Sequence, residues 1–169
     1  RESTLKKWIT NSAPADCNTE KNDIPPSLEY TRKYFRWQQT VPRIELENYI
    51  RNETGIEFGN LQNIVPLERG LSGRLKRIRI VGTLKSFEIA KELTIRRALS
   101  ATTLYSACFI VERVMAAEGL PQAFTLKGAG WGHGVGMCQT GAAMMALQGA
   151  TYQQIIEQYY RGAQIGQAF

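Results

Sequence analysis

The part of the sequence that most constrains the fold is Gly128-Ala129-Gly130-Trp131-Gly132-His133-Gly134-Val135-Gly136-Met137-Cys138-Gln139-Thr140-Gly141-Ala142. Every other residue from Gly128 to Gly136 is a glycine, and the single histidine of the chain, His133, lies among them. A backbone this poor in side chains lets a ligand approach closely and adopts dihedral angles that other residues avoid. We therefore predict a loop that contacts a substrate, although a Gly-rich hairpin turn with an exposed imidazole would have the same composition.

The glycine spacing does not fit a phosphate-binding loop. It departs from G-x-G-x-x-G, no lysine follows as in a P-loop, and no downstream acidic residue is placed to hold a ribose. Nucleotide binding through this segment is therefore not expected.

Two helices are predicted after the loop. Helix-forming residues fill the run from Met137 to Leu147, and Gly149 is placed to end that helix in a left-handed conformation. The loop thus leads into a helix N-terminus, whose unpaired N–H groups favour polar or anionic acceptors. Thr151 and Gln154 have the spacing of a capping box, which predicts a second helix that closes at Gly162. The apolar face of this second helix consists of Ile155, Ile156 and Tyr159.

The residues before the loop predict an α+β fold with a mostly antiparallel sheet and flanking helices. Residues 1–30 are polar and are expected to form an irregular N-terminal arm with one short helix near Leu5–Trp8, ahead of a domain over 31–169. Helices are expected from Pro42 to about Gly55 and over 93–99. Strands are expected at 34–40, 61–67, 74–81, 87–90, 107–114 and 124–127. Short turns between consecutive strands favour antiparallel pairing.

Charge and length restrict the function classes. The chain has 169 residues, a formal net charge of +6 and no apolar run long enough to cross a bilayer. It does not begin with Met, and we expect it to be a fragment of a longer protein. Its basic residues cluster at Arg69, Arg74, Lys76, Arg77 and Arg79. Such a cluster attracts anionic partners such as wall polymers, nucleic acids or anionic membranes, but solvated strand faces also contain such clusters.

The three cysteines do not suggest a disulfide framework. Cys108 lies in an apolar run and is expected to be a small core residue. Cys17 and Cys138 could pair or bind a metal, yet neither belongs to a close Cys-x-x-Cys pair.

The glycine-rich stretch and the residues after it resemble the C-terminal signature of the stage II sporulation protein D / amidase-enhancer family. The similarity rests on Gly130 to Met137, Gln139, Gly141-Ala142, Met145-Ala146, Gly149, Tyr152, Ile155, Tyr159-Tyr160 and Gly162. Weaker counterparts lie upstream, at Phe35-Arg36-Trp37, Ser72-Gly73-Arg74, Gly82-Thr83 and Ile95-Arg96 with Leu99. The resemblance covers most of the chain from about Phe35 to Ile165.

The resemblance implies an extracytoplasmic bacterial enzyme that remodels peptidoglycan. Lytic transglycosylases of this kind break the bond between N-acetylmuramic acid and N-acetylglucosamine and leave a 1,6-anhydro end. One carboxylic acid with a raised pKa can donate the proton and later accept one. In that family the catalytic glutamate precedes an alanine-rich helix ending in Ala-Arg-Thr-Tyr, and no such segment occurs in this sequence. The catalytic residue is therefore unknown, and we expect the general acid to lie upstream of Arg1.

Candidate substrate-binding residues follow from the resemblance and from the loop. They are Arg74, Arg96, Gly132, His133, Gly134, Gly136, Met137, Gln139 and Tyr159. His133 is a groove wall or hydrogen-bond donor to sugar, a residue that holds the loop, or a metal ligand. Arg74 after Ser72-Gly73 also fits a turn residue, and Gln139 also fits a helix cap.

No cofactor is expected and no metal site is favoured. His133, Cys138 and Cys17 are the residues that could supply zinc ligands. Zinc sites occur in some members of the family, where position 138 is usually serine. A Cys138–His133 nucleophile pair is a further alternative, although no orienting Asn or Asp is evident nearby.

Peptidoglycan glycan strands are the expected partner, together with a cell-wall amidase or another wall-remodelling protein. A second hypothesis is a non-catalytic module that binds the wall or stimulates an amidase. A third is nucleic-acid binding through the basic strands, which we do not expect because basic and aromatic residues alternate only at Tyr34-Phe35-Arg36-Trp37.

Overall fold

The computed structural model describes residues 2–11, 14–20, 23–116 and 119–166. The chain forms two compact units. The first comprises Arg1–Ser12 and Arg36–His133, and the second comprises Ala13–Phe35 and Gly134–Phe169. The predicted α+β class is confirmed, with all strand pairs antiparallel.

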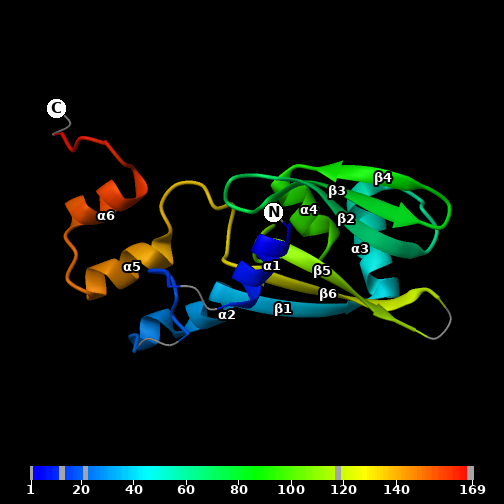
Figure 1. Cartoon of the computed structure of the whole chain (residues 1–169), viewed down its shortest axis with the longest axis horizontal. Coiled ribbons are helices and arrows are strands. Elements are labelled where there is room, and N and C mark those ends of the chain that lie inside the picture. Colours follow the sequence, from blue (N-terminus) through cyan, green and yellow to red (C-terminus); the bar gives the residue numbers. More distant parts are fainter. Residues whose placement is uncertain (1, 12–13, 21–22, 117–118, 167–169) are drawn as a thin grey trace. The chain divides into compact units, whose positions relative to one another are not determined.

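The first unit contains two three-stranded sheets (Figure 1). One sheet has the order β1-β6-β5 and the other the order β2-β3-β4. The strands are β1 (Arg36–Pro42), β2 (Leu61–Arg69), β3 (Leu75–Gly82), β4 (Ser86–Ala90), β5 (Phe109–Met115) and β6 (Pro121–Ala129). Each predicted strand is present, but β1 begins later than expected because Arg32–Phe35 form the short helix α2. The 3-10 helix η1 (Pro26–Thr31) precedes α2, and the fixed φ angles of Pro25 and Pro26 favour its start.

The described residues of this unit form three helices. They are α1 (Glu2–Thr10), α3 (Arg43–Thr54) and α4 (Glu92–Ala98). Helix α3 ends as predicted at Gly55, which has a left-handed φ of 67° and donates its N–H to the Arg51 carbonyl. Helix α1 is longer than the short helix expected near Leu5–Trp8.

The apolar core of the first unit is filled by alternate strand residues and by one face of each helix. Its fully buried members include Leu46, Ile50, Phe58, Leu61, Leu75, Ile78, Ile80, Ile95, Leu99, Leu104, Phe109 and Phe124. A smaller cluster beneath α1 joins Ile9 to Cys108, Ile110 and Ala129. Cys108 is thus a buried apolar residue, as predicted, and burial raises the pKa of its thiol.

A buried carboxylate joins α3 to the strand that follows it. Glu47 is 4% exposed, and its Oε1 accepts the N–H of Leu61 at 2.7 Å and a hydrogen bond from Arg43 Nη1 at 2.6 Å. Arg51 Nη1 lies 3.8 Å from the other oxygen. The backbone donor at the start of β2 is therefore satisfied by a side chain, as a buried N–H requires.

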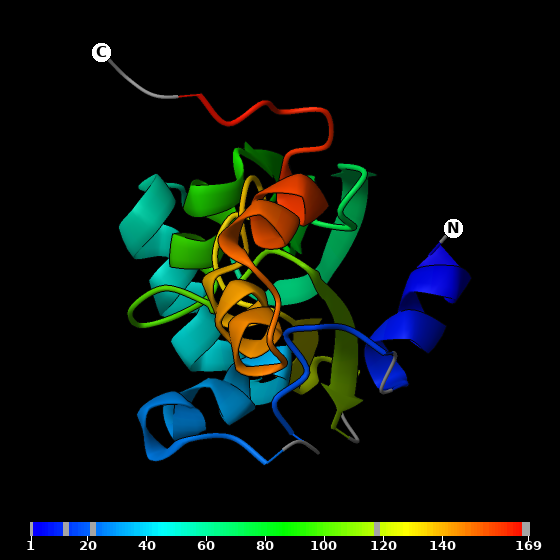
Figure 2. The ribbon, with the colours of Figure 1, turned by 90° about the vertical axis from the view of Figure 1, so that its left-hand side faces the viewer.

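The second unit is mainly helical. Its elements are the 3-10 helix η1 (Pro26–Thr31), α2 (Arg32–Phe35), α5 (Gln139–Leu147) and α6 (Tyr152–Tyr159). The chain turns between α5 and α6 at Gly149, whose φ is 89° (Figure 2). The capping box predicted for Thr151 and Gln154 is present at the start of α6. Helix α5 begins at Gln139, two residues later than the predicted Met137, because Cys138 is extended and caps the helix.

Tyr159 joins α6 to the start of α5. A Cβ on Gly141 would lie 2.2 Å from the Tyr159 hydroxyl, so only glycine fits at that position of α5. Burial raises the pKa of Tyr159 to about 12, with smaller contributions from Cys138, Asp16 and Cys17. The neutral phenol is therefore the form that suits this packing.

Replacing Glu47 by Ala should lower the free energy of unfolding by about 3 kcal/mol, because the buried N–H of Leu61 loses its acceptor and the partly buried Arg43 loses its ion-pair partner. Glu53→Ala on the exposed side of α3 is the matched control and should change it by less than about 0.5 kcal/mol. Urea unfolding of the two variants measures the difference. Equal losses would show that Glu47 does not join α3 to β2.

The Tyr159 phenol should make stability depend on pH at the alkaline end. In the unfolded chain a tyrosine loses its proton near pH 10, whereas the folded pKa is about 12. Stability from this group is complete below pH 10 and falls as the pH rises toward 12. Tyr159→Phe should reduce the late-titrating component of the absorbance at about 295 nm, to which Tyr49, whose pKa is also raised by burial, contributes as well. Tyr152→Phe on the same helix should leave that component in place, and its loss there would contradict the assignment.

Candidate functional site

The segment between β6 and α5, residues 130–138, is called the glycine loop below. Its glycines adopt φ angles of 73° at Gly130, 84° at Gly132, 71° at Gly134 and 78° at Gly136. Residues with a Cβ rarely adopt these angles, which explains the alternation of glycine with other residues. The boundary between the two units falls inside this loop, after His133.

Gly128 is required for a different reason. It pairs with Trp37 across β6 and β1, and a Cβ at this position would lie 2.1 Å from the indole ring. The absence of a side chain allows Trp37 to lie on the strand. Its Nε1–H then donates to the Gly130 carbonyl at 3.1 Å.

Hydrogen bonds hold the backbone on both sides of Trp131, an arrangement called the Trp131 clamp below. The Gly130 carbonyl accepts from Trp37, as described. The Gly132 N–H donates to the Tyr105 carbonyl at 2.7 Å, and the Gly132 carbonyl accepts from Arg74 Nε at 3.1 Å. The Trp131 side chain is nevertheless 60% exposed. The clamp therefore presents a large aromatic surface from a fixed backbone.

Trp131 was not among the candidate residues from the sequence. The signal that points to it is a bulky aromatic residue with glycines at both neighbouring positions, in a stretch with few other side chains.

Arg96 stabilises the segment that supports the clamp. Its Nε donates to the Leu104 carbonyl at 2.6 Å, and its Nη1 lies 3.3 Å from Glu92 Oε1. Tyr105, which follows Leu104, accepts the Gly132 N–H with its carbonyl. Its ring packs edge-on against Trp37, with ring centroids 5.9 Å apart. Arg74 and Arg96, both predicted to bind substrate, thus each use their Nε to hold backbone carbonyls.

The second unit holds the remaining part of the loop. The Met137 N–H donates to the Tyr160 hydroxyl at 3.2 Å, and the same oxygen would lie 3.2 Å from a Cβ on Gly136. Cys138 is the N-cap of α5, where its sulfur accepts the Gly141 N–H at 3.4 Å. Gln139 is exposed and is the first residue of α5. The capping role considered for Gln139 is filled by Cys138.

The predicted site residues therefore divide between the units. Arg74, Arg96, Gly132 and the exposed His133 belong to the first unit, where Arg74 and Gly132 are in direct contact. Gly134, Gly136, Met137, Gln139 and Tyr159 belong to the second. Their roles in substrate binding remain predictions.

The residues considered for zinc are also divided, with His133 in the first unit and Cys17 and Cys138 in the second. Over 2–11, 14–20, 23–116 and 119–166, no three His, Cys, Asp or Glu side chains are gathered as a metal site requires.

The basic cluster is largely paired within the first unit. Glu68 lies 3.7 Å from Lys76 Nζ and 3.6 Å from an Arg77 nitrogen, and Glu88 lies 3.5 and 3.0 Å from nitrogens of Arg77 and Arg79. Arg69 pairs with Glu2. These basic residues lie on strands and form ion pairs with neighbouring carboxylates. This arrangement agrees with the alternative that the cluster is a solvated strand face.

A hollow of about 220 Å³ lies between α3 and the segment after α4. Its lining residues are Tyr49, Asn52, Glu53, Arg97, Ser100, Ala101 and Thr102. None of them belongs to the glycine loop. In the part of the chain that the structure describes, no helix combines the length and apolar character needed to span a bilayer.

Comparisons with known proteins give two results. A segment of 44 residues is 50% identical to the stage II sporulation protein D of Bacillus subtilis (strain 168) and 48% identical to that of Bacillus amyloliquefaciens. That segment covers 26% of this chain and only 13% of each of those proteins, so it supports a partial relationship. Residues 16–136, more than half of the chain, match the family described as "Domain of unknown function (DUF8618)". The protein therefore belongs to the DUF8618 family.

Proposed function

We propose that this domain binds the glycan strands of bacterial peptidoglycan and that Trp131 is the principal contact. The observation that carries the proposal is the exposed indole on the clamped backbone. The resemblance of the glycine loop to the stage II sporulation protein D family and the partial matches to two proteins of that name support it. On this proposal the domain acts outside the cytoplasm.

Sugar rings suit such a site chemically. One face of a pyranose ring exposes C–H groups, which pack on an aromatic ring, while its hydroxyl and acetamido groups bind polar partners. The neighbouring glycines add no side chains that would keep a strand away. Because the clamp fixes the backbone before binding, little conformational entropy is lost when the ligand arrives. His133, next to Gly132 and exposed, would supply a hydrogen bond to the same ligand.

Paired basic residues argue against a polyanion as the ligand. Nucleic-acid binding depends on unpaired Lys and Arg side chains along the phosphate backbone. Here Lys76, Arg77 and Arg79 lie against carboxylates, so their attraction for phosphates is reduced. An uncharged part of a polymer, such as the sugar backbone of a glycan, fits the exposed indole better.

The whole protein is proposed to act as a lytic transglycosylase of the sporulation-protein-D type. That reaction requires a carboxylic acid that remains protonated near neutral pH. Among the described carboxyl groups, the two with a displaced pKa are Glu29 and Glu112. Hydrogen bonds from Arg32 and Lys127, respectively, lower these pKa values, which is the wrong direction for a general acid. Glu29 and Glu112 are therefore not proposed as the general acid.

A non-catalytic role is the second candidate. In this role the domain is a module that binds the wall or stimulates an amidase. Both candidates use the Trp131 surface, and they differ in whether the bound glycan is cleaved.

Trp131→Ala should weaken co-sedimentation of the protein with purified sacculi about tenfold, the effect of losing one aromatic stacking contact. Trp131→Phe keeps an aromatic surface and should retain most of the binding. Tyr152→Ala removes an exposed aromatic residue from the second unit and serves as the control. Retention on DNA-cellulose but not on sacculi would refute the proposal.

Incubation of the chain with glycan strands should release no 1,6-anhydro-muropeptides, because the general acid is proposed to lie outside it. Mass spectrometry of the soluble products, with a known lytic transglycosylase as the positive control, checks this result. Release of anhydro products by this chain would show that its own residues supply the acid, and it would exclude the purely binding role.

A further inference from the structure

We propose that Glu2 and Arg69 are positioning residues through which the N-terminal helix α1 sets the Trp131 clamp. The ligand-binding part of this proposal rests on the proposed function, whereas its structural part does not. Within the first unit, a series of contacts leads from α1 to the turn between β2 and β3, and from that turn to Gly132.

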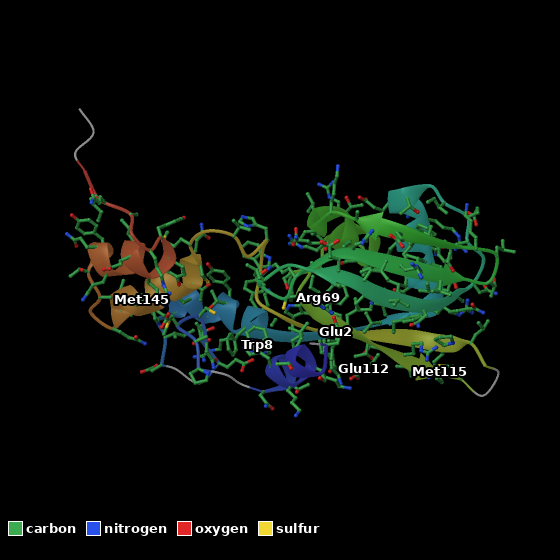
Figure 3. The ribbon with its side chains drawn as sticks, turned by 45° about the horizontal axis from the view of Figure 1, so that its top comes forward. Glu2, Trp8, Arg69, Glu112, Met115 and Met145 are labelled. Atoms are coloured by element: carbon green, nitrogen blue, oxygen red, sulfur yellow. The ribbon has the colours of Figure 1, made fainter. Side chains whose placement is uncertain are left out.

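Helix α1 is docked at several points on the sheet β1-β6-β5. Ile9 is buried against Cys108, Ile110 and Ala129, with Leu5 beside them. Next to Ile9, the guanidinium of Arg36 lies 4.3 Å from the centre of the Trp8 ring and donates to the Trp8 carbonyl at 3.1 Å. Figure 3 shows Trp8 and Glu2 at opposite ends of α1, with Arg69 next to Glu2.

Arg69 is the point where α1 meets the β2–β3 turn. Its side chain is 13% exposed and forms two hydrogen bonds with the Glu2 carboxylate. Its Nη1 also donates to the Gly73 carbonyl at 2.8 Å, and its Nη2 donates to the Phe109 carbonyl at 2.9 Å. The planar guanidinium can satisfy these acceptors together because its donors have fixed directions. Glu2 therefore fixes the orientation of a group that holds two backbone segments.

The turn itself carries the contact to Arg74. Gly70 N–H donates to the Arg74 carbonyl at 2.8 Å, and Gly73 has a φ of 75°. A Cβ on Gly73 would lie 3.0 Å from Leu5 Cδ1, so α1 also touches the turn directly. The next residue, Arg74, donates its Nε to the Gly132 carbonyl. A shift of the turn therefore moves the donor that holds one side of Trp131.

A second ion pair on α1 provides a matched control. Lys6 Nζ lies 3.5 Å from Glu112 Oε1, which links the helix to β5 without touching the β2–β3 turn. If α1 only stabilises the first unit as a whole, breaking the Glu2–Arg69 pair or the Lys6–Glu112 pair should change hydrogen exchange in the glycine loop equally. If the path through Arg69 is specific, only the Glu2 change should reach Gly132.

The test compares Glu2→Gln and Lys6→Gln in the full chain by amide hydrogen exchange. Glu2→Gln should raise the exchange rate of the Gly132 N–H about threefold, the size expected for a partly exposed ion pair, while Lys6→Gln leaves it unchanged. Urea unfolding of both variants verifies that global stability is similar. Unchanged exchange at Gly132 in Glu2→Gln, or an equal increase in Lys6→Gln, would overturn the proposal.

A double variant tests whether Glu2 acts through Arg74. Arg74→Lys alone should raise Gly132 exchange, and adding Glu2→Gln should give no further increase because the path is already interrupted. Additive increases would contradict it. Sacculus binding of the same variants should follow the exchange rates. If the variants change the Gly132 exchange rate but the parent chain does not bind sacculi, the proposed function is refuted and the positioning role remains.

Discussion

The structure of the first unit depends on the backbone hydrogen bonds where the ends of several strands meet. Leu75 at the start of β3 donates its N–H to the Ala107 carbonyl, and Gly132 after β6 donates to the Tyr105 carbonyl. These groups lie beyond the regular ladders of the two sheets and would be costly to bury without partners. Arg74 and Ser106 side chains satisfy two further carbonyls there, those of Gly132 and Ala129. This set of contacts connects both sheets with the first part of the glycine loop.

Local chemistry made much of the fold predictable. The end of α3 at Gly55, the capping box of α6 and the special glycine conformations all follow from residues close together in the sequence. The order of strands and helices from β1 onward was predicted correctly for the same reason, since alternation and turn residues are local signals, whereas η1 and α2 were not predicted.

Contacts between distant residues were not predictable in the same way. The Glu2–Arg69 pair spans 67 positions, and nothing in the local pattern of either residue specifies the other. The docking of α1 was therefore missed, and so was the division of the strands into two sheets. Arg74 and Arg96 were predicted to bind substrate from the family resemblance, and in the structure their Nε atoms donate to backbone carbonyls. Trp131 gained importance only when its exposure and the fixed backbone on both sides became known.

The thiol of Cys108 has a consequence for how the first unit can be studied. It lies beneath α1, and its raised pKa disfavours the thiolate that alkylating reagents attack. Modification therefore requires the helix to lift away, which is a local opening whose free energy can be much smaller than that of complete unfolding. The labelling rate of this sulfur, compared with that of an unstructured thiol, thus reports how often the amino-terminal segment leaves the sheet.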